Sequence, residues 1–65
     1  MLYDLSNIKN MRQKLGITQT ELAKLTNVSQ SMITKIEREK IEPSYTIAKK
    51  IFTVLDFPIT FPLSV

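Results

Sequence analysis

The sequence predicts an all-α fold: a compact bundle of four to five short helices with a central helix-turn-helix and an extended apolar C-terminal tail. Several short segments repeat apolar residues at helical spacing, and helix start signals precede them. Two of these segments are joined by a turn so short that only a helical corner fits. We expect the helix-turn-helix domain to occupy residues 1–57 and the tail residues 58–65.

Composition excludes several classes of function. The 65 residues include no cysteine and no histidine, which removes disulfides, thiolate metal sites and the usual nucleophile and base pairs of enzymes. We therefore expect no enzyme activity, metal or cofactor. The net charge of +3 is a mild basic bias that suits a polyanionic partner. No apolar run is long enough to cross a membrane, no signal peptide pattern is present, and the lack of cysteine suits a reducing compartment. We expect a cytoplasmic, nucleoid-associated protein.

The first helix is expected from about Leu5 to Leu15, with Asp4 or Ser6 capping its start. Gly16 stands where a left-handed residue would end it. The apolar stripe of this helix consists of Leu5, Ile8, Met11 and Leu15.

Two further helices form the corner. Thr18 and Glu21 have the spacing of a capping box, which predicts a second helix that ends near Thr26. Asn27 tolerates the left-handed backbone that the turn requires, and Ser29 caps a third helix over residues 29–38. The hydrophobic staples that flank the two starts are Ile17 with Leu22 and Val28 with Ile33.

Pro43 and Ser44 open a fourth helix, from Tyr45 to about Leu55, with Lys49 and Lys50 on its outer side. Its inner side consists of Ile47, Ala48, Ile51, Phe52 and Leu55, and the predicted core adds Met11, Ile33 and Ile36.

The sequence FPITFPLSV follows, in which Pro58 and Pro62 forbid a continuous helix and the apolar residues alternate as in an extended segment. This tail could cover the domain's own core, form a dimer contact, or begin a linker in a longer protein. The sequence does not choose among these three.

The stretch LGITQTELAKLTNVSQSMITKIEREKIEPS, with helical flanks of matching spacing, resembles the lambda-repressor-like helix-turn-helix regulators of the XRE or Cro/C1 type. The resemblance covers roughly Ile8 to Leu55. The residues that carry the resemblance are a glutamine that opens the second helix, a small Ala23 inside the corner, Val28 after the turn, and the S-Q-S and I-x-K-I-E patterns. The proline-bearing start of the fourth helix is also similar to archaeal regulators that carry further ligand-binding domains.

The resemblance implies that the third helix enters the major groove while the second lies across the DNA backbone. The residues implied in base contact are Gln30, Ser31, Thr34 and Lys35, whose side chains can pair with base edges. The residues implied in phosphate contact are Gln19, Arg38, Lys40 and Ser44. The alternative for each is an ordinary solvated surface position. Tyr45 could pack or donate its hydroxyl to a phosphate.

Two charged residues have a structural role in the family. Arg12 and Glu37 match positions that pair, partly buried, between the first helix and the end of the third. The alternative is two unpaired surface charges. The chain departs from the family pattern in having Asn27 in the turn and Glu39 after the third helix, where glycine is usual, and Glu42 adds to the local acidity.

Two functions remain open at this point. The first is a dimeric, sequence-specific regulator of transcription, expected to be a repressor on a pseudo-palindromic site in double-stranded DNA. The second is a protein-interaction module, such as an antitoxin or a coactivator-like adaptor. The chain could also be the DNA-binding part of a larger ligand-sensing regulator. No membrane or small-molecule partner is evident.

Overall fold

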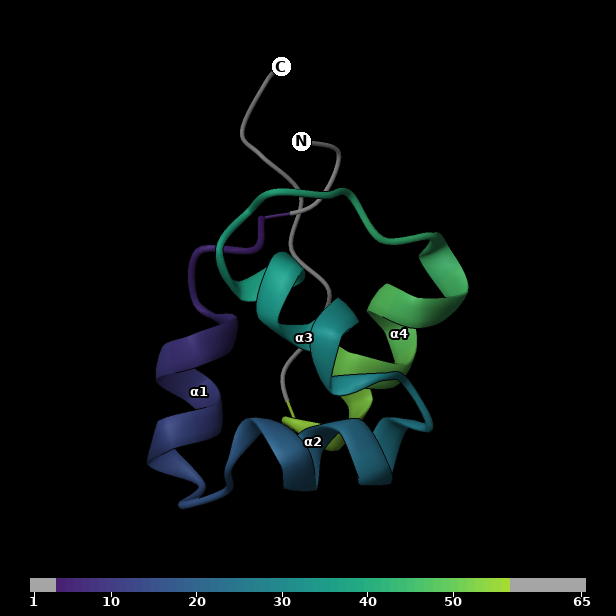
Figure 1. The fold of residues 1–65 in the computed structure, drawn as a ribbon. Coiled ribbons are helices and arrows are strands. Elements are labelled where there is room, and N and C mark those ends of the chain that lie inside the picture. Colours follow the sequence, from purple (N-terminus) through teal and green to yellow (C-terminus); the bar gives the residue numbers. More distant parts are fainter. Residues whose placement is uncertain (1–3, 57–65) are drawn as a thin grey trace.

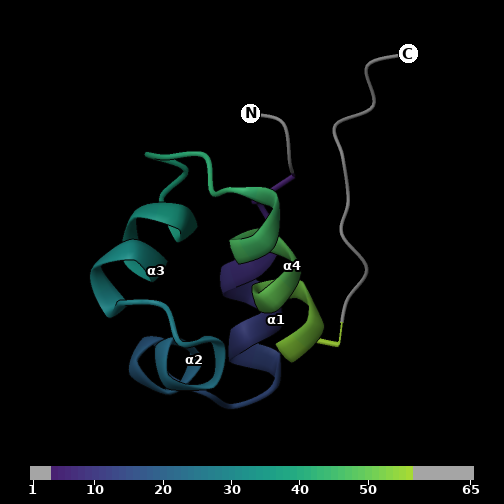
Figure 2. The same cartoon turned by 90° about the vertical axis from the view of Figure 1, so that its right-hand side faces the viewer.

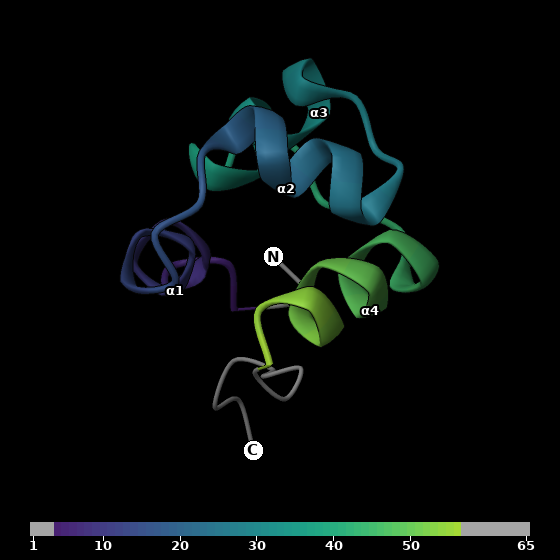
Figure 3. The same cartoon turned by 90° about the horizontal axis from the view of Figure 1, so that it is seen from below.

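The computed structural model describes residues 4–56 as four α-helices, and the predicted all-α class is confirmed. Their bounds are α1 Ile8–Lys14, α2 Gln19–Thr26, α3 Gln30–Glu37 and α4 Tyr45–Val54. Figure 1 labels the four helices, and the two views turned by 90° show that α3 lies on one side of the molecule and α1 and α4 on the other (Figures 2 and 3). The predicted tail over residues 58–65 lies outside the described residues.

The starts of three helices follow the predicted caps. The Thr18 Oγ1 accepts from the Glu21 N–H while the Glu21 side chain accepts from the Thr18 N–H, so the predicted capping box is present. The Ser29 Oγ accepts from the Met32 N–H, and the Ser44 Oγ caps α4. These bonds satisfy donors that the first helical turn leaves free.

The predicted start of the first helix is wrong. Helix α1 begins at Ile8, three residues later than expected, and its N-cap Asn7 makes no side-chain capping bond. Asp4 and Ser6 bond to each other instead, because the Asp4 Oδ1 accepts from both the N–H and the hydroxyl of Ser6. These side-chain bonds favour a local turn at residues 4–6 over a first helical turn.

Every described helix is followed by a residue with a left-handed backbone, namely Gly16, Asn27, Glu39 and Asp56, with φ between 53° and 72°. Gly16 and Asn27 were expected there. After α3, the N–H of Lys40 donates to the Lys35 carbonyl and that of Glu39 to the Ile36 carbonyl. This is the usual left-handed helix ending, made here with a glutamate in place of glycine.

The core forms where the four helices meet. Its fully buried members include the predicted Ile33, Ile36, Ile51 and Phe52. Met11 and Ile47 were expected in the core but are only partly buried against it. Leu15 was expected on the buried stripe and is 49% exposed. The left-handed turn at Gly16 redirects the chain after α1, so Ile17 packs against the core in its place.

Candidate nucleic-acid interface

Helix α3 presents a polar face to solvent. Gln30, Ser31 and Lys35 are exposed, and Thr34 is partly buried. The opposite side of the helix packs in the core, where Ile33 and Ile36 are both 0% exposed. The face therefore points away from α1 and α4 (Figures 2 and 3). We call these four polar residues the α3 face.

A buried ion pair joins α1 to the end of α3. The Arg12 Nε donates to the Glu37 Oε2 at 2.6 Å and Arg12 Nη2 to Oε1 at 3.1 Å, with side chains 9% and 3% exposed. A further Arg12 donor, Nη1, bonds the Ile17 carbonyl at 2.9 Å. Bidentate geometry and the extra bond offset the cost of removing both charges from water. The pair fixes the angle at which α3 leaves the bundle.

Gln19 ties α2 to the same cluster. Its Nε2 donates to the Glu37 Oε1 at 3.1 Å, and its Oε1 accepts from the Thr34 hydroxyl at 3.0 Å. Both ends of the Gln19 amide are therefore bonded within the domain, which leaves one Nε2 hydrogen for a phosphate. The Thr34 hydroxyl likewise donates its hydrogen within the domain. The Thr34 methyl group remains, and it suits contact with the methyl group of a thymine.

A contact that the sequence analysis missed lies at the other end of α3. The Thr20 hydroxyl, on the second residue of α2, donates to the Gln30 Oε1 at 2.9 Å. Both residues are exposed. Only the packing of α2 against α3 brings the starts of the two helices within reach of each other (Figure 1). A helix-turn-helix geometry was the one signal that could have indicated this pair.

The expected phosphate-binding residues Arg38, Lys40 and Ser44 are all exposed and follow α3 closely in the chain. Arg38 and Lys40 stand on the left-handed turn, on either side of Glu39. The Ser44 hydroxyl accepts a capping bond, so its own hydrogen is available to an anion. The structure keeps these three residues on one connection and apart from the buried cluster.

The start of α2 combines a capping carboxylate, that of Glu21, with backbone donors. The backbone N–H of Thr18, and after it the Thr18 side chain, lowers the pKa of Glu21. Glu21 is exposed and uses its carboxylate to cap the helix, and it keeps its negative charge at neutral pH.

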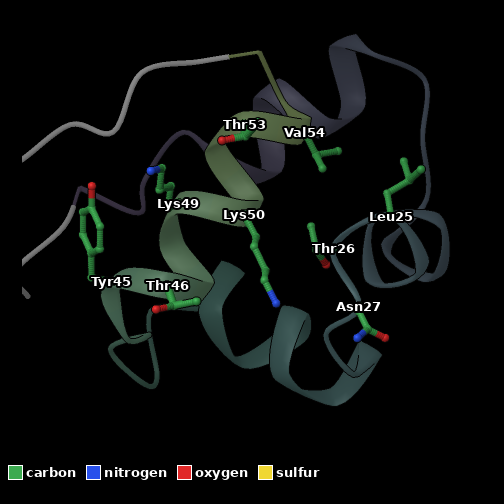
Figure 4. A pocket seen from close by; sticks show the side chains of 9 residues that line it. All are labelled: Leu25, Thr26, Asn27, Tyr45, Thr46, Lys49, Lys50, Thr53 and Val54. Carbon is green, nitrogen blue, oxygen red and sulfur yellow. The ribbon is translucent and has the colours of Figure 1, made fainter.

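A hollow lies between α2 and α4 and includes no residue of α3 (Figure 4). It is an open groove of about 710 Å³. Leu25 and Tyr45 line it and are 61% and 55% exposed, and Lys49 and Lys50 contribute charge. Tyr45 is thus a groove residue with a solvent-accessible ring, and it does not pack in the core.

The described part of the chain contains no cluster of histidine, cysteine or acidic residues that could hold a metal ion. No helix within residues 4–56 is long and apolar enough to cross a membrane.

The helical corner and its exposed α3 face agree with the comparison to known families. A family model described as helix-turn-helix matches residues 8–61. The chain belongs to this XRE-type helix-turn-helix family. Its members are DNA-binding domains of transcriptional regulators, so the chain is a DNA-binding domain of that type.

Two similar proteins come from archaea. One is a putative HTH-type transcriptional regulatory protein of Methanococcus vannielii, which is 40% identical over 52 residues. The other is an uncharacterized HTH-type transcriptional regulator of Archaeoglobus fulgidus, which is 39% identical over 51 residues. The matches cover 80% and 78% of this chain. They cover 16% of the first relative and 73% of the second, so most of the first relative lies outside the shared domain.

Proposed function

We propose that this helix-turn-helix domain binds a specific sequence of double-stranded DNA through α3 in the major groove and regulates transcription as a repressor. The observation that carries the proposal is the α3 face, which is polar, exposed and anchored from behind by Ile33 and Ile36. An α-helix fits the major groove, where each base pair displays a distinct pattern of donors and acceptors. Repression follows if the bound domain blocks polymerase from the same DNA.

We assign roles within this interface by chemistry. Gln30 has an exposed amide for adenine, whose oxygen also accepts from the Thr20 hydroxyl. Ser31 has a hydroxyl for either base, and Lys35 has an ammonium for guanine. Thr34 offers its methyl. Arg38, Lys40 and the Ser44 hydroxyl bind phosphates, and the remaining Gln19 hydrogen adds one more phosphate contact.

The active form is proposed to be a homodimer. One α3 of eight residues covers only a few base pairs, and two copies related by a two-fold axis would read half-sites about one DNA turn apart. The first relative extends far beyond the shared region, so a longer regulator that contains this domain is also consistent with the proposal.

The decisive experiment is selection of duplexes from random sequence, followed by affinity measurements across a range of salt concentrations. We expect a recurring motif with two-fold symmetry and an affinity that falls steeply with salt. Arg38→Ala and Lys40→Ala should each reduce the salt slope by about 1 without changing the motif. Sedimentation with and without the selected duplex tests the dimer. If no motif emerges, the proposal is wrong.

The groove between α2 and α4 favours a second candidate, a protein-interaction module. Its exposed Leu25 and Tyr45 provide the apolar contacts that such a partner needs, and its lysines suit an acidic one. In that case no DNA motif is selected, and Gln30→Ala leaves the activity of the protein unchanged.

A further inference from the structure

The Thr20–Gln30 bond carries an inference about specificity, which rests on the proposed function. We propose that Thr20 orients the Gln30 amide and so decides on which DNA strand the adenine read by Gln30 must lie. Thr20 is then a specificity-determining residue that itself touches no base.

The packing of α2 against α3 places the Thr20 hydroxyl within hydrogen-bonding distance of the Gln30 amide. The Thr20 Oγ1 donates to the Gln30 Oε1 at 2.9 Å, from the second residue of α2 to the first residue of α3. Leu22 and Ile33 hold the two helices, and both are 0% exposed. The hydroxyl therefore occupies a fixed position, although the amide that it meets is on an exposed side chain.

The two ends of a glutamine amide are chemically opposite, because the oxygen only accepts and the nitrogen only donates. In the structure the Thr20 hydroxyl donates to the Gln30 oxygen, so this oxygen lies on the α2 side and the nitrogen on the other. One lone pair of the oxygen and both nitrogen hydrogens stay available. The amide can thus still form a bidentate pair with a base.

Adenine presents the N6 donor and the N7 acceptor in the major groove, so a bidentate pair places the glutamine oxygen at N6 and its nitrogen at N7. The order of N7 and N6 across the groove reverses when A·T is replaced by T·A. An amide with a fixed order of oxygen and nitrogen matches one orientation of the base pair. An amide free to rotate by half a turn can match either.

The same device recurs once in the domain. Gln19 also has its Oε1 held by a threonine hydroxyl, that of Thr34, at 3.0 Å. There the nitrogen faces the buried Glu37, so the fixed amide serves structure. At Gln30 the remaining amide edge faces solvent, where a base can approach.

The test compares Thr20→Val, which keeps the shape and removes the hydroxyl, with Thr20→Ser, which keeps the hydroxyl. Gln30→Ala first identifies the base pair that Gln30 reads, as the one position of the selected motif whose preference is lost. Affinities are then measured for duplexes with A·T or T·A at that pair. Thr53→Val on α4, also an exposed threonine, is the matched control.

We expect the full domain to prefer one orientation by at least about fivefold, the lower end for a bidentate pair. Thr20→Val should lose about fivefold of that preference, as the loss of one hydrogen bond predicts, while Thr20→Ser and Thr53→Val keep it. Two results would overturn the inference while leaving the proposed function intact: an unchanged preference in Thr20→Val, or an equal loss of affinity for all duplexes. Absence of any motif for the unaltered domain overturns the proposed function itself.

Discussion

The two ends of α3 carry similar polar side chains in opposite environments. At its start, Gln30 is exposed and its side chain accepts from the Thr20 hydroxyl. At its end, the Glu37 side chain is 3% exposed and accepts bonds from both Arg12 and Gln19. Burial raises the cost of an unmet hydrogen bond or charge, so the buried end is committed to structure. The exposed end keeps capacity for a ligand.

This contrast predicts that variants at the two ends of α3 should change different properties, namely stability at one end and DNA binding at the other. Changes at the buried end should lower stability, and they should affect DNA binding through folding and through the loss of the bond that holds the Gln19 amide. Changes at the exposed end should alter DNA binding with little effect on stability.

The largest effect is expected for Glu37→Ala. It leaves the Arg12 guanidinium buried without its carboxylate, and we expect a loss of about 3–5 kcal/mol in the free energy of unfolding, measured with urea. Such a loss would unfold much of a domain this small. Glu39→Ala removes an exposed carboxylate two residues later and should change stability by less than about 0.5 kcal/mol.

The pairing itself is tested by a double-mutant cycle. Arg12→Ala combined with Glu37→Ala should cost less than the sum of the two single losses, because each single variant already breaks the same contact. Additive losses would show that the two charges do not stabilise each other.

Gln30→Ala should produce the next largest effect, on binding alone. We expect it to weaken binding to the selected duplex by about 1–3 kcal/mol, measured by fluorescence anisotropy, and to relax preference at one base pair. Its free energy of unfolding should stay within about 0.5 kcal/mol of the original. Gln13→Ala on α1 is the matched control, since Gln13 is also exposed and lies away from α3. A stability loss comparable to that of Glu37→Ala would contradict the separation.

Glu39→Gly tests the strained turn between the two groups of DNA-contact candidates. Glu39 has φ 56°, a conformation that costs a side chain about 1 kcal/mol. Glu39→Gly should therefore be more stable than Glu39→Ala by about that amount, while both should bind DNA more tightly at low salt because both remove a negative charge.

Gly16→Ala is the reverse test of the same strain. Gly16 has φ 72°, and nothing lies within 4 Å of an added Cβ. A loss of about 1 kcal/mol is thus expected from the backbone alone. Equal stability of the Gly and Ala variants at either position would argue against strain in these turns.

The smallest effect concerns acid sensitivity. The folded-state pKa of Glu21 is lowered, first by the backbone N–H of Thr18, so its stabilising contribution is present above the ordinary value of 4.5 and is lost as the pH falls through the lowered one. Glu21→Gln keeps an acceptor for the capping box but has no such titration. The unfolding free energy of the variant should decrease less steeply with falling pH below about 5. Identical pH profiles would exclude this contribution.

Asp4 provides a parallel case outside the corner. The Ser6 side chain, and then the Ser6 backbone, lowers the pKa of Asp4. Asp4→Asn should likewise flatten the acid limb of the stability profile, and combining it with Glu21→Gln should add the two effects, because the residues share no partner.

Local signals account for most of what the sequence predicted well. The capping box of Thr18 and Glu21, the cap at Ser29 and the left-handed Asn27 each depend on residues within four positions of one another. The start of α1 was predicted wrongly because Asp4 and Ser6 are both good caps, and their mutual bond was not considered. Leu15 fitted the helical spacing but lies past the last helical residue, where periodicity no longer decides burial.

Neighbouring residues and their spacing were enough to predict the four helices, the starts of α2, α3 and α4, and the polar side of α3. The tertiary structure decided what the polar groups do. Arg12 and Glu37 are 25 residues apart, and Thr20 and Gln30 are 10 apart, so only packing brings their atoms into contact. Residue spacing along one helix cannot specify a hydrogen bond between two helices, since such a bond depends on the angle and distance at which the helices pack.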